Sequence, residues 1–142
     1  MGMYTHLVLN VNFKHDTPEE VIDTIKYMVG DTETPPPEQN HKLFGTSRWD
    51  YCLRCDSWYF MGGTNTTFEK DMDTWKLTVN SNCKNYSNEY QEFLDYIQPY
   101  IEYREFLGFI RYEEYEHPTL IYNTTEGIEY KTPEVELEGR LY

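Results

Sequence analysis

The chain has 142 residues, of which 39% are hydrophobic and 17% aromatic, so the composition predicts one folded domain over residues 1–142 and excludes a disordered chain. The 12 Lys and Arg residues are outnumbered by 25 Asp and Glu, and the formal charge of −13 disfavours direct binding to a nucleic-acid backbone. No stretch approaches the roughly 20 apolar residues that cross a membrane, so we expect a cytoplasmic protein whose 3 cysteines stay reduced.

The first third of the chain predicts a strand that is followed at once by a helix. Apolar and polar residues alternate over 5–13, which is typical of a strand with one buried face. The residues at 17–20 form a helix-start pattern with Thr17 as the cap, and Gly30 predicts the end of that helix. Three consecutive prolines in 31–42 then predict a loop.

The middle of the chain predicts a hairpin and one further strand. Aromatic and aliphatic residues alternate with polar ones over 49–53 and again over 58–61, with a short turn around Asp56 between the two runs. A turn at Gly62-Gly63 leads into a polar stretch. The next alternating run, 75–79, is predicted to be a strand.

The last third of the chain predicts a second helix, a hairpin and a tail. Ser87 can cap a helix with apolar residues at helical spacing, which Pro99 should end or kink. The strands 106–112 and 119–122 should pair as a hairpin. The segment 125–142 is expected to be either an edge strand or an acidic tail.

The order of these elements indicates the fold class. It is β-α-β-β-β-α-β-β, and short connections between strands favour antiparallel neighbours. We therefore expect an α+β fold in which two helices pack on one face of a mainly antiparallel sheet.

The cysteines and histidines are the residues from which a metal site could be built. Cys52 and Cys55 form a C-x-x-C pair that Cys83 and His41 could complete into a zinc tetrahedron. Residues three apart on a strand point to opposite faces, however, and no second pair follows. The four histidines are scattered, without the spacing of a ligand pair or a recognisable catalytic set. We therefore expect no metal, no cofactor and no enzymatic activity.

The polar side of the predicted sheet is the candidate binding surface, because Arg side chains and tyrosine rings suit a planar or anionic small molecule. The candidate ligand- or partner-binding residues are Asn10, Asn12, Arg48, Arg54, Tyr59 and Arg111, and the same polar side should also carry Lys76, Thr78 and Asn80. A solvent-facing sheet surface without a ligand is the alternative interpretation.

Three segments carry a resemblance to a class of proteins. The stretches Asp16–Gly30, Arg48–Arg54 and Gly108–Tyr122 resemble small uncharacterised proteins encoded by tailed bacteriophages. The likeness brings no active site to carry over. It implies a viral accessory protein that acts in the cytoplasm of a bacterial host.

The leading functional hypothesis is a non-enzymatic accessory protein that binds and neutralises a component of host antiviral defence. It would do so by acidic contact with a defence protein or by sequestering a nucleotide signal. A metal-dependent nucleotide hydrolase that uses the abundant carboxylates is one alternative. A structural or virion-assembly protein is another, and stable self-association into a homo-oligomer is the observation that would distinguish it.

Overall fold

One antiparallel sheet and two helices form the described part of the chain, which the computed structural model covers at residues 3–57, 60, 65–103 and 105–134. The six strands lie in the order β2-β3-β1-β4-β5-β6. In chain order the elements are β1 (Thr5–Asn12), α1 (Glu19–Val29), the 3₁₀ turns η1 (Lys42–Gly45) and η2 (Cys52–Arg54), β2 (Thr67–Asp71), β3 (Thr74–Cys83), α2 (Glu89–Ile97), the 3₁₀ turn η3 (Gln98–Tyr100), β4 (Phe106–Tyr112), β5 (Thr119–Thr124) and β6 (Gly127–Lys131).

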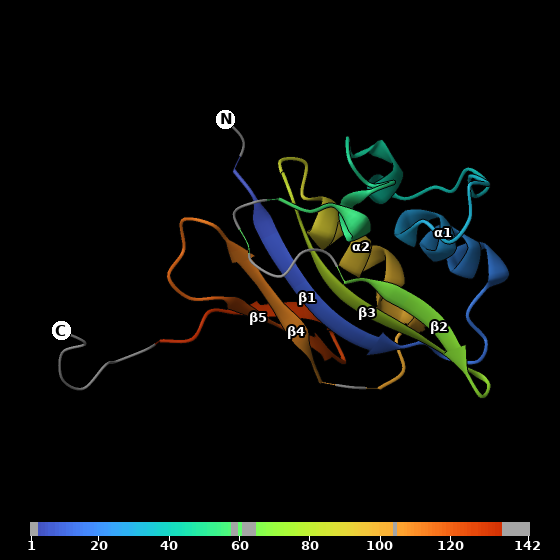
Figure 1. Cartoon of the computed structure of the whole chain (residues 1–142). Helices are drawn as coiled ribbons and strands as arrows, with labels where there is room; N and C mark the ends of the chain where they lie inside the picture. Colours follow the sequence, from blue (N-terminus) through green and yellow to red (C-terminus); the bar gives the residue numbers. More distant parts are fainter. Residues whose placement is uncertain (1–2, 58–59, 61–64, 104, 135–142) are drawn as a thin grey trace.

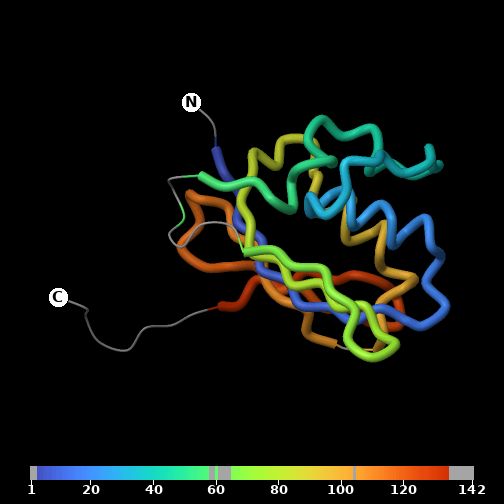
Figure 2. The backbone as a smooth tube through the Cα atoms, turned by 45° about the vertical axis from the view of Figure 1, so that its right-hand side comes forward, coloured from blue at the N-terminus to red at the C-terminus, as the bar shows by residue number. Residues whose placement is uncertain are grey.

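Both helices lie on the same face of the sheet. Figure 1 shows α1 and α2 on one side of the strands, and the turned view in Figure 2 keeps them on that side. The predicted α+β class is therefore confirmed, with two helices on one face of an antiparallel sheet.

The side chains of the central strand β1 alternate between the inner face of the sheet, which the helices cover, and the outer face. Its residues alternate between buried and half-buried, and Leu7, Leu9 and Val11 enter the core beneath the helices. Because β1 pairs with β3 on one side and β4 on the other, polar side chains of three strands adjoin on the opposite face. This outer face carries His6, Val8, Asn10 and Asn12 from β1, Lys76, Thr78, Asn80 and Asn82 from β3, and Phe109 and Arg111 from β4.

The helix ends follow the predicted pattern in part. Gly30 ends α1 in a left-handed conformation with a φ of 88°, which a residue without Cβ adopts easily. Thr17 was wrongly predicted as the cap, because its hydroxyl donates to the Lys14 carbonyl while Pro18 occupies the N-cap position. The predicted end of the second helix is confirmed, since Pro99 lies in η3 directly after α2.

The hairpin predicted from 49–53 and 58–61 is wrong in its first arm, which forms turns and η2. Burial explains the error, because Tyr51 is exposed while the adjacent Cys52 and Leu53 are both fully buried. Neighbouring buried residues do not fit the period of a half-buried strand. Trp58, Tyr59 and Met61 lie outside the described residues. The hairpin that follows next in the described chain joins β2 to β3, and β2 was not predicted.

The predicted tail begins with an edge strand. β6 pairs with β5 and occupies the start of the segment 125–142, while 135–142 lies outside the described residues. Within the described part, neither helix has the length and apolar character that a membrane span requires.

Candidate ligand-binding site

A cluster of rings lies on the outer face around His6, near the start of the central strand β1. The His6 ring is 4.8 Å from Phe60 and tilted by 31°, and its centroid is 5.7 Å from the edge-on ring of Phe109. Its Nε2 is 2.6 Å from the side-chain oxygen of Asn80 on the neighbouring strand. With that oxygen as acceptor, Nε2 carries the hydrogen, so Nδ1 is the acceptor nitrogen of the ring.

A cation adjoins this cluster. Arg111 of β4 is the direct cross-strand neighbour of His6, and its guanidinium carbon is 6.0 Å from the centre of the Phe60 ring. Its Nε donates to the Tyr115 carbonyl at 3.1 Å. A guanidinium that is held by a carbonyl and lies near a ring loses less freedom when it binds an anion.

Two amide oxygens on the outer face are shielded from solvent and lack a hydrogen-bond partner among the described residues. They are the Oδ1 atoms of Asn10 and Asn82. Asn82 is 1% exposed and its Nδ2 donates to Asp56 at 3.3 Å, so only its oxygen is left unsatisfied. An unsatisfied buried acceptor costs roughly 1–3 kcal/mol, and because both oxygens are shielded from solvent, a donor on a ligand reaches them only when the atoms that cover them move aside.

The spacing of these groups defines the extent of the site. Asn82 lies opposite His6 in the β1–β3 ladder, and Asn10 lies opposite Thr78. His6 and Asn10 are four residues apart on one strand, which corresponds to roughly 13 Å. Rings, a cation and two unsatisfied acceptors thus lie along one strip of the outer face.

The predicted site residues are divided between two parts of the molecule. Asn10, Asn12 and Arg111 share the outer face, and the sequence alternation predicted this side for Asn10 and Asn12. Arg48 and Arg54 do not, because the strand expected to carry them is replaced by η2 and its preceding turn. Tyr59 lies outside the described residues.

The central members of the site, His6, Phe60, Phe109 and Asn82, were not among the predicted binding residues. His6 and Phe109 are at outward-facing positions of strands that were predicted correctly, so the sequence contained the information that they lie on the outer face. Their proximity could not be predicted, because local alternation does not show that β1 pairs with β3 and β4.

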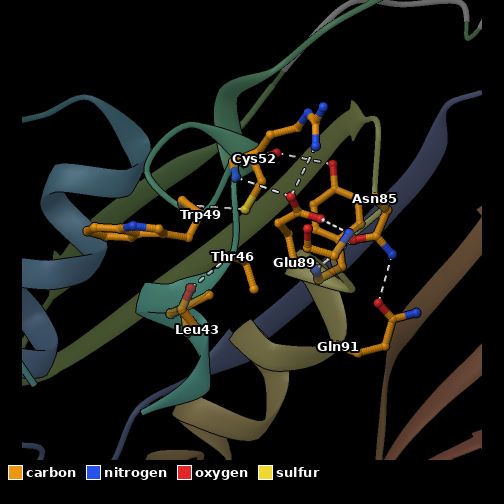
Figure 3. Close-up of polar contacts among 10 residues, drawn as sticks. Leu43, Thr46, Trp49, Cys52, Asn85, Glu89 and Gln91 are labelled. Carbon is orange, nitrogen blue, oxygen red and sulfur yellow. Dashed lines mark hydrogen bonds and ion pairs between the residues drawn. The ribbon is translucent and has the colours of Figure 1, made fainter. Parts of the chain in front are cut away.

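Arg48 instead takes part in a buried ion pair with Glu89, shown with its surroundings in Figure 3. Glu89 is fully buried at the start of α2, and its Oε2 is 3.5 Å from Nη1 of Arg48. That carboxylate also accepts from the backbone N–H groups of Arg48 and Ser87, at 3.1 and 3.0 Å. Ser87 is therefore a donor to Glu89 and not the side-chain cap that was predicted. We assign this pair to fold stability, because every partner is internal.

No disulfide joins any two of the three cysteines, Cys52, Cys55 and Cys83. Burial raises the pKa of Cys83 to about 12 and raises the pKa of Cys52 well above its ordinary value. Burial also raises the pKa of the half-buried Cys55. Because the thiolate is the nucleophile, these thiols are poorly suited to nucleophilic attack near neutral pH.

His41 forms a pair with Asp95. Its Nε2 is 2.9 Å from Asp95, and its Nδ1 accepts from the Leu43 backbone N–H at 3.0 Å. Both ring nitrogens are occupied, so this His–Asp pair has no free nitrogen to act as a general base. Across the described ranges, no group of three His, Cys, Asp or Glu residues is arranged to hold a metal ion.

Comparison of the chain with family models, with curated proteins and with solved structures found no match. The geometry of the outer face is therefore the basis of the functional proposal.

Proposed function

We propose that the protein is a non-enzymatic binding protein whose outer sheet face holds a small planar anion of the nucleotide class. The observation that carries the proposal is the juxtaposition of His6, Phe109 and Arg111 on adjacent strands of the outer face, beside the shielded oxygen of Asn82. Each group matches one part of a nucleotide.

The match is chemical. A base has flat faces that pack against the rings of His6 and Phe109, and N–H groups that donate to amide oxygens. A phosphate accepts charge-assisted hydrogen bonds from the Arg111 guanidinium. Thymine and uracil have fewer such donors, so bases with an exocyclic amine should bind more tightly.

The bacteriophage context that the sequence likeness implies suggests a biological role for this binding. We propose that the bound nucleotide is an antiviral signal of the host and that the protein acts by sequestration. A binding protein of this kind needs no catalytic group, only enough affinity and copies to lower the free concentration of the signal.

The decisive experiment is calorimetric titration of the whole chain with nucleoside monophosphates and cyclic nucleotides. Arg111→Gln should weaken binding by about tenfold or more, because a hydrogen bond to a charged group contributes roughly 1.5–3 kcal/mol. Arg54→Gln is the matched control. It removes the same charge from an exposed position of η2 and should leave the affinity within about twofold.

The outcomes separate the proposal from a charge effect. Equal weakening by Arg111→Gln and Arg54→Gln would mean that net charge governs binding and that the outer face is not the site. The absence of binding by every nucleotide at millimolar concentration would overturn the proposal.

An acidic contact with a basic partner protein is the second candidate, and one hollow favours it. This hollow has a volume of about 580 Å³ and includes Glu20, Glu38 and Asp95 in its lining. Charge contact at an exposed surface weakens steeply with salt, whereas a ligand packed between rings depends on salt much less. Titration at two ionic strengths therefore distinguishes the candidates.

A further inference from the structure

The sheet ends on one side in β6, whose outer edge is not paired by any described segment. In the described part of the chain β6 pairs with β5 alone. Its first three residues are half-buried, and Tyr130 and Lys131 are exposed. Such an edge offers a row of backbone N–H and C=O groups to another strand.

We propose that β6 pairs antiparallel with β6 of a second copy of this chain, in a two-fold register centred on Tyr130. This register places Glu129 of each copy opposite Lys131 of the other. It also places Ile128 opposite Thr132 and brings the two Tyr130 rings together. All of these are favourable cross-strand pairs.

The pleat of β6 places Glu129 and Lys131 on the same face, so they can pair with the opposite charges of a second copy. Glu129 and Lys131 project from one face of β6, since their partners in β5 are Tyr122 and Leu120, two residues apart. Within one chain their charged atoms are already 3.7 Å apart, with side chains 41% and 64% exposed. Pairing would therefore extend one ion pair per chain into an alternating set of four charges.

The position of Tyr130 on the other face supports the same register. It projects toward α2, where Asp95 and Glu92 lie near enough to affect its phenol. Burial raises the pKa of Tyr130 to about 12, and the residue as a whole is still 39% exposed. A second ring across the two-fold axis would cover that exposed part.

The opposite edge of the sheet lacks this self-complementarity. In β2 the consecutive residues Glu69, Lys70 and Asp71 place like charges opposite each other when the register is centred on Glu69 or Lys70. A charged edge of this kind is a common protection against pairing. The two edges therefore differ in kind, and β6 is the one suited to a second copy.

The expected dimer is weak. An edge pairing of about five residues buries less than the roughly 1,200–2,000 Å² of a stable interface. Association should therefore depend on concentration. It should be detectable by sedimentation equilibrium of the intact chain at high micromolar concentration and near-physiological salt.

A charge swap tests the register directly. Lys131→Glu alone, and Glu129→Lys alone, each place two like-charge pairs across the interface and should weaken association by about tenfold. The double variant Glu129→Lys with Lys131→Glu restores opposite charges at both positions and should recover the wild-type dissociation constant. Lys70→Glu, with the same charge change on β2, is the control and should leave association within about threefold.

Restoration by the double variant is the result expected from pairing at Tyr130. A wild-type chain that stays monomeric at millimolar concentration would overturn the proposal. Equal weakening by Lys70→Glu and Lys131→Glu would also overturn it, because net charge and not the β6 register would then control association. Circular dichroism of each variant establishes that it is folded.

Discussion

Gly108 is the residue at which the backbone of the sheet is packed most tightly. A Cβ atom added there would lie 2.0 Å from the Val8 carbonyl oxygen in β1, and the φ of Gly108 is 155°. The register between β4 and β5 shifts between Phe106 and Gly108, so the residue lies at a bulge in β4. The close approach of β4 to β1 therefore requires glycine.

Gly108→Ala should lower the free energy of unfolding by at least about 3 kcal/mol, because the clash is with backbone and no flexible side chain can yield. Gly45→Ala is the control, since a Cβ there meets no atom within 4 Å. Urea denaturation of both variants measures the difference. A loss of less than about 1 kcal/mol for Gly108→Ala would mean that β4 shifts easily away from β1.

Among the elements, η2 shows how far local pattern can mislead. Its segment alternates like a strand, yet the buried Cys52 carbonyl accepts hydrogen bonds from Tyr90 and Ser81 at 3.1 and 3.0 Å. These contacts join η2 to α2 and β3, which are distant in sequence. Burial is therefore decided by partners that a short window cannot contain.

The ion pair between Glu89 and Arg48 should be a major stabilising contact between α2 and the turn before η2. Glu89→Ala should cost about 2 kcal/mol or more, because it leaves two backbone N–H groups and a partly buried guanidinium without their acceptor. Glu92→Ala removes a carboxylate from the same first turn of α2 and should cost less than about 1 kcal/mol.

Thermal denaturation in an Arg48→Met background supplies the critical comparison for this pair. If the two side chains act together, Glu89→Ala should cost less in that background than in the wild type. Costs that simply add would show that Glu89 acts through the backbone N–H groups of residues 48 and 87 and not through the Arg48 guanidinium.

The strands and helices that sequence predicts correctly are those with long, regular patterns. The alternation over 5–13 predicts β1 and which of its residues face outward, so Asn10 and Asn12 were assigned to the correct side. Arg48 and Arg54 were not, because their local alternation does not form a strand. The strip around His6 depends on the registers of β1 with β3 and β4, and these follow from long-range pairing.

At the scale of the whole molecule, the formal charge of −13 should oppose folding through self-repulsion. Raising ionic strength from about 0.01 to about 0.1 M shortens the screening length from about 30 to about 10 Å. We expect the melting temperature to rise by about 2–4 °C, which corresponds to roughly 1 kcal/mol for a chain of this size. Sodium and potassium chloride should act equally.

Scanning calorimetry at low protein concentration measures this change without a contribution from dimer formation. A melting temperature that falls with salt would show that the few ion pairs, such as Lys131 with Glu129, outweigh the general repulsion. Such a result would also predict that the β6 pairing weakens as salt increases.

The order of the strands has a consequence for how the chain folds. β1 is the first strand in sequence but the middle of the sheet, and its two neighbours, β3 and β4, end at Cys83 and Tyr112. Until those strands leave the ribosome, both edges of β1, which has one apolar face, stay open to other chains. The sheet therefore forms late in synthesis and through contacts of long sequence separation, which slow folding and lengthen the period of exposure to aggregation.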